Sequence, residues 1–311
     1  MSGGGSKLTL DRVGALVLTY RRPRLATEVV RGLLDHEGLA AQRVLLVVNG
    51  EGGLDDPLLE SEINVLRLDE NLGPAGGYRE GLLHAAQTLD IDWLYICEDD
   101  VGLFDLPTPR LGGLLGRVTG QGGGAAEPIG AVVAYGRDLD PRTGITTPHR
   151  PGPEELEPVD VAAWGATLLS LDVVRSGVLP DAELFFGYED FDFWLRMRRK
   201  GFRLLLDNTT ARAVERSVLD AGREEAHSGR RPVDAQEPWR RYYEARNFFH
   251  LARRHGHLGW TLMHALKTLR RMQLSATSEH RSAAARGFWD GLRGRNGKNP
   301  DFLRQAGELG A

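Results

Sequence analysis

The sequence predicts an α/β protein, with a mostly parallel mixed sheet flanked by helices and a helical appendage at the C-terminal end. Three observations lead to this fold class. Short apolar runs, each long enough for one strand, alternate with segments whose apolar residues repeat at helical spacing. Such alternation is typical of right-handed βαβ units and parallel sheets. From Trp239 onward the strand-like runs stop, and helical patterns with a basic surplus follow.

Composition is that of a globular protein with no global preference for nucleic acid. The chain has 311 residues, of which 41% are hydrophobic and 26% charged, and its net charge is −4. Its single cysteine, Cys97, excludes a disulfide framework and fits a reducing, cytoplasmic location. Because no apolar run reaches the roughly 18 residues of a membrane span, we expect no transmembrane helix.

The first third of the chain carries the clearest alternation. Val13 to Thr19 is a nearly continuous apolar run, as expected of a strand buried on both faces. Pro23 suits the first turn of a helix that follows. The further predicted elements are strands at 44–48, 63–68 and 91–97 and a helix at 74–89.

The middle of the chain is less regular. The glycine-rich segment 112–124 and the proline-containing segment 138–158 are predicted to be loops. Strand patterns return at 165–171 and 202–206, on either side of a helix at 187–201 that ends in a glycine. The polar segment 218–238 is predicted to be a mobile loop.

Three successive acids, Glu98, Asp99 and Asp100, close the strand at 91–97. In open α/β sheets, ligands bind beyond the carboxyl ends of the strands, where this triplet would lie. Like charges repel when they are clustered, and a divalent cation removes that cost. A metal site and a merely solvated strand end are both open interpretations of the triplet.

A second acidic cluster, Glu189, Asp190 and Asp192, opens the helix at 187–201 among aromatic residues. Carboxylates suit a helix N-terminus, which explains one acid well and three less well. A carboxyl group in an apolar setting has a raised proton affinity and can act as a general base. This cluster is therefore the candidate catalytic centre.

Two further features are weaker signals. Asn71 to Gly81 is a glycine-rich turn entering a helix, where a backbone can approach a phosphate closely. Trp164 and Gly165 precede a predicted strand, and the indole either stacks on a sugar or belongs to the core.

Taken together and in order, these segments resemble the family 2 inverting glycosyltransferases with the GT-A (Rossmann-like) fold, particularly the bacterial rhamnosyl- and galactofuranosyl-transferase-like branch. The resemblance covers about residues 13–246. It is carried by Leu18–Pro23, Val47–Gly50, Glu70–Gly77, Glu98–Asp100 and Tyr188–Arg196.

The resemblance implies a role for each matched position. Asp190 aligns with the catalytic base of the family, and Asp100, Glu98 and Glu215 with ligands of Mn²⁺ or Mg²⁺. The implied donor-binding residues are Thr19, Tyr20, Asn49, Gly73, Gly76, Gly77, Arg79 and Asp99. Those implied for the acceptor and the transferred sugar are Trp164, Gly165, Glu189 and Asp192.

The chain departs from the family pattern at three positions. Val48 stands where an Asp usually precedes Asn49, so the Asn49 amide would have to make the contact with the base. Glu80 stands where an Arg is usual, and Arg79 is one position away. Glu215 occupies the place of a metal-binding His; it is either a hard ligand in its place or a surface charge.

The implied domain order is a disordered segment at 1–10, a GT-A nucleotide-sugar-binding catalytic domain at 11–217, the loop at 218–238 and a basic helical region at 239–311. The implied reaction transfers a sugar from a UDP- or dTDP-sugar to a hydroxyl of a glycan, a lipid-linked acceptor or a small molecule. A degenerate, non-catalytic sugar-nucleotide-binding or scaffold protein is the first alternative. A nucleotidyltransferase is a weaker one, because Thr19–Pro23 lacks the glycine-rich loop that such an enzyme needs.

The basic region has two interpretations. Its cations either bring the protein to the inner membrane face as a peripheral protein or form a solvated face or a homodimer surface.

Overall fold

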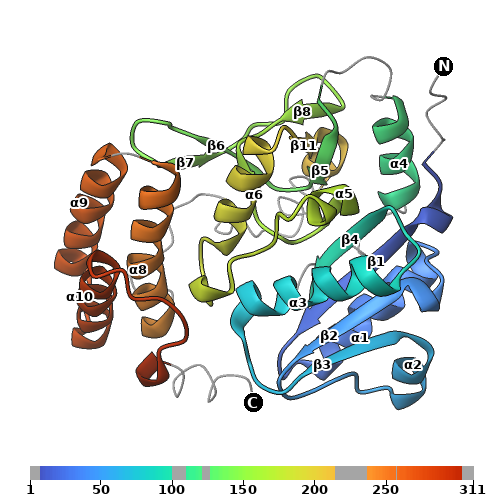
Figure 1. The fold of residues 1–311 in the computed structure, drawn as a ribbon, viewed down its shortest axis with the longest axis horizontal. Coiled ribbons are helices and arrows are strands. Elements are labelled where there is room, and N and C mark those ends of the chain that lie inside the picture. The colour runs from blue at the N-terminus through green and yellow to red at the C-terminus, as the bar shows by residue number, and fades with distance from the viewer. Residues whose placement is uncertain (1–7, 100–109, 121–126, 214–236, 257, 303–311) are drawn as a thin grey trace.

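The structure is a computed structural model that describes residues 8–99, 110–120, 127–213, 237–256 and 258–302. These residues form an eight-stranded main sheet and a three-stranded second sheet, surrounded by helices (Figure 1). In spatial order the main sheet consists of β3 (Asn64–Leu68), β2 (Val44–Asn49), β1 (Val13–Thr19), β4 (Trp93–Glu98), β10 (Thr167–Ser170), β5 (Ile129–Val133), β11 (Arg203–Asp207) and β8 (Leu156–Pro158). The second sheet consists of β7 (Thr146–Pro148), β6 (Gly136–Leu139) and β9 (Val161–Ala162).

The main sheet is mixed and mostly parallel, as the sequence predicts. β1 pairs in parallel with β2 and β4, β2 with β3, and β5 with β11. β10 is antiparallel to both β4 and β5, and β8 is antiparallel to β11. The predicted fold class, including the helices at the C-terminal end, is confirmed.

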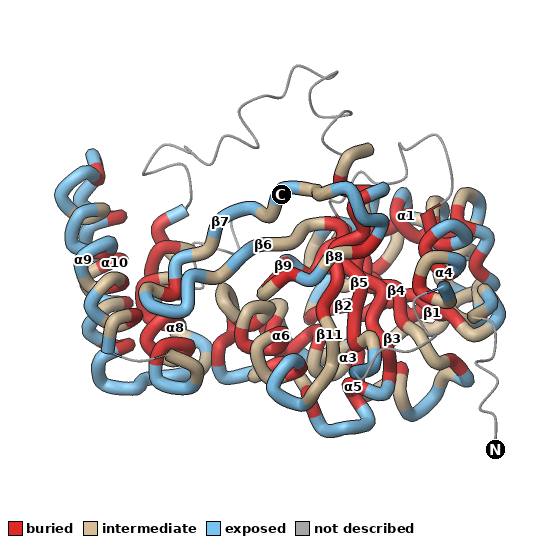
Figure 2. The backbone as a smooth tube through the Cα atoms, turned by 90° about the horizontal axis from the view of Figure 1, so that it is seen from above, coloured by how far each residue is buried: buried red, intermediate tan, exposed pale blue. Residues whose placement is uncertain are grey.

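Helices cover both faces of the main sheet, so its strands are buried on both sides (Figure 2). Along β1, Val13, Ala15 and Val17 belong to one core cluster, whereas Leu16 belongs to the other. One face is covered by α1 (Pro23–Arg31) and α4 (Arg110–Gly120), and the other by α3 (Gly73–Thr88), α5 (Leu171–Arg175) and α6 (Glu189–Arg199). The remaining short helix before residue 100 is α2 (Pro57–Glu62).

The predicted loop at 112–124 is wrong for its first part, because α4 occupies it as far as Gly120. Leu111, Leu114 and Val118 recur at helical spacing and are buried against the sheet. Gly112 and Gly116 lie where a Cβ would meet nothing within 4 Å. They lower the intrinsic helix propensity of the segment, but no packing contact is lost by the absence of a side chain. Burial of the leucine face therefore overrides the glycine content.

The segment 138–158 is also more ordered than predicted, since it contains β7 and β8 and the end of β6. Of the predicted mobile loop at 218–238, residues 218–236 lie outside the described residues. Residues 1–7 of the segment expected to be disordered also lie outside them, and Leu10–Arg12 forms a short 3-10 helix.

Three C-terminal helices, α8 (Pro238–His255), α9 (Leu258–Leu274) and α10 (Ser278–Leu292), stand together at one end of the molecule beside α6 (Figures 1 and 2). α9 exposes Leu258, Leu262, Leu266 and Leu269. In the described part of the chain, no helix combines the length and the apolar character needed to cross a membrane. Peripheral membrane contact or a homodimer through these helices stays a prediction.

Candidate functional site

The carboxyl ends of β1, β2 and β4 meet at one edge of the main sheet. Their register pairs Leu18 with Glu98 and Thr19 with Val48, so Thr19, Asn49 and Glu98 are near neighbours there. β10 runs antiparallel and begins at the same edge, because its first residue pairs with Ile96. The sheet topology alone therefore brings together several segments that the sequence predicts to be functional.

Asp99 is firmly held at this edge. Its carboxylate accepts a hydrogen bond from the Thr19 hydroxyl at 3.1 Å and one from the Arg22 guanidinium at 2.9 Å. The Asp99 side chain is only 9% exposed. Thr19 and Asp99, both predicted to bind the donor, thus contact each other, and Arg22 joins them.

The Asn49 side chain fixes the glycine-rich turn. Its Oδ1 accepts from the Leu72 N–H at 2.8 Å, and its Nδ2 donates to the Gly73 carbonyl at 3.0 Å. Gly73 has φ +68°, and a Cβ there would lie 2.1 Å from the Phe185 carbonyl oxygen. A Cβ on Gly77 would clash with Leu18. These glycines permit close packing of α3 against β1 and the turn before α6.

The other predicted donor residues lie close to these segments. Gly76 is buried in the first turn of α3, packed against Leu72. Arg79 donates to the Pro180 carbonyl at 3.3 Å, and the Tyr20 ring lies 5.2 Å below the Arg21 guanidinium.

The turn before α6 adopts an uncommon backbone conformation. Phe185 and Tyr188 have φ values of 60° and 67°, and Gly187 has φ 81°. Positive φ values at bulky residues cost energy and persist only where surrounding contacts hold them. One such contact is the hydrogen bond from the Ala75 N–H to the Phe185 carbonyl at 3.2 Å.

α8 supplies the other contacts. Asn247 Nδ2 lies 2.8 Å from the Leu184 carbonyl oxygen, 2.7 Å from that of Phe186 and 2.9 Å from that of Gly187. Arg246 also donates to the Leu184 carbonyl, at 3.0 Å. Both side chains are buried. The C-terminal helices therefore shape the turn that leads directly into Glu189 and Asp190.

Glu189 and Asp190, in the first turn of α6, differ from the paired Asp99. Burial and the neighbouring Asp190 raise the pKa of Glu189 well above its usual value. Glu189 Oε2 is buried and has no hydrogen-bond partner among the described residues. Burial also raises the pKa of Asp190, to about 7, although the Phe191 N–H and the Arg137 charge act in the opposite direction. A carboxyl group with this pKa can take up and release a proton near neutrality.

Asp192, predicted to contact the acceptor or the sugar, is buried within a network of cations. It accepts from Arg196 at 2.8 Å, from Arg254 at 3.0 Å and from His255 at 2.8 Å. These partners lower its pKa despite its burial. Asp192 therefore joins α6 to the end of α8.

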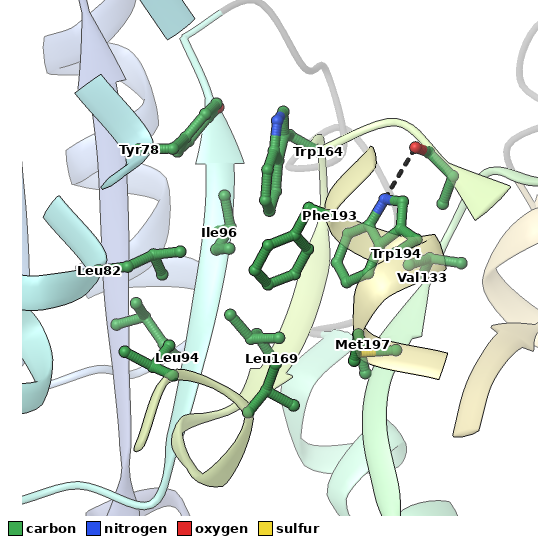
Figure 3. Packing of buried hydrophobic residues seen from close by; sticks show 14 of the residues in the cluster. Tyr78, Leu82, Leu94, Ile96, Val133, Trp164, Leu169, Phe193, Trp194 and Met197 are labelled. Atoms are coloured by element: carbon green, nitrogen blue, oxygen red, sulfur yellow. Dashed lines mark hydrogen bonds between the residues drawn. The ribbon is translucent and has the colours of Figure 1, made fainter. Parts of the chain in front are cut away.

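Trp164 lies in the core at the edge of this site (Figure 3). Its ring centroid is 4.8 Å from that of Tyr78, 4.9 Å from that of Phe193 and 5.2 Å from that of Trp194. It is 2% exposed, and its Nε1 has no partner among the described residues. Gly165, which follows it, is also buried.

The two acidic clusters face each other across this aromatic group. Glu98 contributes to the raised pKa of Glu189, and burial together with Glu98 and Asp99 raises that of Tyr78. Within the described ranges, no group of three or more His, Cys, Asp or Glu side chains is arranged to hold a metal ion. Asp100 and Glu215, two of the three predicted metal ligands, lie outside those ranges.

The residues present fit a hard divalent cation in their chemistry. Glu98, Asp99 and Glu189 all act electrostatically on Tyr78, and Glu189 Oε2 has no hydrogen-bond partner among the described residues. Carboxylate oxygens are the ligands that Mg²⁺ and Mn²⁺ prefer.

Sequence reasoning assigned no role to Arg22, Arg137 and Asn247. Arg22 lies in Leu18–Pro23, one of the segments that carry the resemblance, so its position after the first strand could have indicated a role in the site. Arg137 and Asn247 reach the site from the second sheet and from α8, and no local pattern marks them.

No protein-family model matches the sequence, and no curated protein matches it. Among solved structures, the chain is similar to GalNAc-T7 crystallised with UDP, GalNAc and Mn²⁺, with a TM-score of 0.47 and 13% identity. That match covers 63% of this chain and 42% of the GalNAc-T7 chain, so it spans less than half of that protein. It is also similar to S. aureus TarS 1-349, with a TM-score of 0.44 and 12% identity, covering 91% of this chain and 92% of TarS. Neither likeness bears on the chemistry of the site.

Proposed function

We propose that the protein is a metal-dependent inverting glycosyltransferase of GT-A type, which moves a sugar from a UDP- or dTDP-sugar to an acceptor hydroxyl. The observation that carries this proposal is the Asp190 carboxyl group, whose pKa is raised to about 7 at the acidic edge of the sheet. A base of that strength suits deprotonation of a hydroxyl at neutral pH.

In the proposed reaction, the acceptor oxygen attacks the anomeric carbon as the bond to the nucleotide diphosphate breaks. Asp190 takes the hydroxyl proton, and a single displacement inverts the anomeric configuration. Burial and the neighbouring Asp190 raise the pKa of Glu189, which favours its neutral form and limits the negative charge near the base. Thr19 and Arg22 keep Asp99 in a fixed position at the strand end, close to the donor.

A divalent cation would supply charge neutralisation for the departing diphosphate. Glu98, Asp100 and Glu215 are the residues that we propose to hold it, with Mn²⁺ or Mg²⁺ as the ion. The remaining proposed donor residues are Tyr20, Asn49, Gly73, Gly76, Gly77 and Arg79, and Trp164, Gly165 and Asp192 support the sugar and acceptor region.

One observation favours the alternative of a degenerate, non-catalytic scaffold protein. The Asn49 amide, which would replace the missing acid at Val48, is already engaged by the backbone of Leu72 and Gly73. Weak or absent binding of the nucleotide base would follow from that engagement.

The test is a thermal-shift and donor-hydrolysis screen of UDP- and dTDP-sugars, with and without Mn²⁺. We compare the wild type with Asp100→Ala and with Glu98→Gln. Asp90→Asn is the matched control, because Asp90 precedes the opposite end of the same strand and its side chain is 94% exposed. We expect metal-dependent stabilisation by one donor class and slow hydrolysis, both lost in Asp100→Ala and kept in Asp90→Asn.

Stabilisation without hydrolysis or transfer, in the wild type and with every acceptor tried, would instead favour the non-catalytic alternative. No response to any nucleotide sugar would refute the glycosyltransferase proposal and favour a degenerate scaffold protein.

A further inference from the structure

A cluster of cations lies beside the N-terminus of α6, where the second sheet meets α8 and α9. Arg137 comes from β6, Arg241 from α8, and Lys267 and Arg271 from α9. These elements are packed together, because Leu139 of β6 contacts the apolar cluster that contains Phe248 of α8 and Trp260 of α9. Trp260 also donates to the Pro141 carbonyl at 2.8 Å.

Among the described residues, little negative charge lies beside Arg137, Lys267 and Arg271. Arg271 reaches Glu244 at 3.4 Å, and Glu244 also pairs with Arg241 at 3.0 Å. The Arg137 guanidinium donates to neutral partners, the Thr146 hydroxyl at 2.8 Å and the Thr146 carbonyl at 3.0 Å. Lys267 makes no ion pair with any described residue.

The cluster is costly to assemble in the absence of an anion. Desolvation lowers the pKa of Lys267, and repulsion by Arg271, Arg137 and Arg241 lowers it further, although the nearby Glu244 acts in the opposite direction. Burial likewise lowers the pKa of Arg137. Crowded, partly desolvated cations are stabilised when an anion binds between them, and guanidinium groups match the geometry of phosphate and carboxylate.

The position of the cluster relates it to the proposed base. The Arg137 charge acts on Asp190, and the Tyr188 ring, which directly precedes α6, packs edge-on against Phe248 at 5.4 Å. Lys267 as a whole residue is exposed, although its charged group lies among the other cations, so the cluster opens to solvent. An anion held here would lie on the α8–α9 side of Asp190, away from the acidic edge where the diphosphate of the donor belongs.

We propose that Arg137, Lys267 and Arg271 form a subsite for a phosphate or carboxylate group of the acceptor, adjacent to Asp190. The subsite would select acceptors that carry this anion next to the reacting hydroxyl. Its assignment to the acceptor rests on the proposed function, whereas its ability to bind an anion does not.

The first experiment measures anion binding directly. Inorganic phosphate and D-glucuronate are titrated calorimetrically into the full chain with saturating UDP and Mn²⁺, so that the donor site is occupied. The test variant is Lys267→Gln, because Lys267 has no partner in the described residues whose loss would disturb the fold. Arg270→Gln is the control, since Arg270 is an exposed cation on the same helix.

We expect saturable binding of at least one anion to the wild type, weakened roughly tenfold or more by Lys267→Gln and unchanged by Arg270→Gln. Stronger binding of phosphate than glucuronate would identify a phosphorylated acceptor, and the reverse a uronic acid. Absence of saturable binding, or equal binding by wild type and Lys267→Gln, would overturn the proposal.

The second experiment compares transfer to an anionic and a neutral sugar acceptor of the same ring structure. Lys267→Gln should raise KM for the anionic acceptor and leave kcat/KM for the neutral one unchanged. Equal losses with both acceptors would overturn the specificity role. Failure of donor turnover with persistent Lys267-dependent anion binding would refute the proposed function but not the anion subsite. Failure of anion binding alone would refute only the subsite.

Discussion

Asp99 and Asp190 are both residues of the candidate site, but their surroundings differ. Asp99 follows a strand, pairs with Arg22 and accepts a hydrogen bond from the Thr19 hydroxyl. Asp190 lies in the first turn of a helix, accepts from the Phe191 N–H, and has a pKa of about 7 because it is buried. The Asp99 carboxylate holds two segments together, whereas the Asp190 carboxyl group can exchange a proton near neutral pH.

Asp192 makes the comparison sharper, since it is only two positions from Asp190. Arg196, Arg254 and His255 surround it, and its pKa is lowered. Within a single helical turn, burial with directly bonded basic side chains and burial without them shift the pKa in opposite directions. The identity of a residue as an acid therefore says less about its role than the charges packed against it.

The largest effect should come from removing the proton acceptor. Asp190→Asn should lower the rate of sugar transfer by about 10² to 10⁴, the usual contribution of a general base. Donor binding should persist, because Asp190 is proposed to contact the acceptor. Turnover and thermal shift with the donor check both statements. Asp172→Asn, at an exposed acid in the first turn of α5, is the control and should keep full activity. Full activity in Asp190→Asn would refute the assignment of the base.

The pH dependence of transfer should report the same group. Below a pH of about 7 the Asp190 carboxyl group is protonated, so kcat/KM should fall about tenfold per pH unit as the medium becomes more acidic. Above that pH the rate should level off. Initial rates measured from pH 5 to 9 in one mixed buffer test this. A profile that stays flat down to pH 5 would show that the base has an ordinary carboxyl pKa.

A smaller effect should follow from loosening the turn before α6. Asn247→Ala removes the amide that contacts the carbonyls of Leu184, Phe186 and Gly187. We expect a loss of about 1–3 kcal/mol of unfolding free energy and a fall in kcat of roughly tenfold, because Asp190 would be held less accurately. Chemical denaturation and steady-state rates measure the two effects. Asn296→Ala, which removes an exposed amide bonded to Glu183, is the matched control.

A fall in stability with unchanged kcat would show that Asn247 supports the fold without positioning the base. A changed pH profile in Asn247→Ala would add that the turn also sets the environment of Asp190.

Much of the fold could be predicted from sequence because β1, β2 and β4 are buried on both faces and therefore appear as continuous apolar runs. The sequence predicted a loop in place of α4 because glycine has a low helix propensity. In the structure Gly112 and Gly116 lie where a Cβ would meet nothing within 4 Å, which cannot be predicted from local propensity. The short strands β7 and β8 were missed for a similar reason, since their pairing with β6 and β11 is a long-range property.

The acids of the candidate site could be located from sequence, but their protonation states could not. Asp190 and Asp192 are indistinguishable in the pattern around α6. What separates them is the approach of Arg254 and His255 from the far end of α8. A role for Arg137 and Asn247 could not be predicted, because each belongs to an element that is remote in sequence from the acids of the site.

The smallest expected effect concerns the stability cost of Glu189. Its pKa is raised in the folded state, so the folded protein binds more protons than the unfolded chain once the pH exceeds the usual carboxyl value. The stability contribution of this group is therefore present at low pH and is lost as the pH rises.

Glu189→Gln replaces the carboxyl group by a neutral amide of the same shape that does not titrate. At pH 8 we expect the variant to be more stable than the wild type, and the difference should vanish near pH 4. Urea unfolding at both pH values measures it. The corresponding change at Asp192, Asp192→Asn, should destabilise the protein at pH 8, because Arg196 loses its carboxylate partner and Arg254 keeps only Asp181. Opposite signs for two acids in the same helix would establish that cation pairing, and not burial alone, divides them; equal signs would refute the distinction.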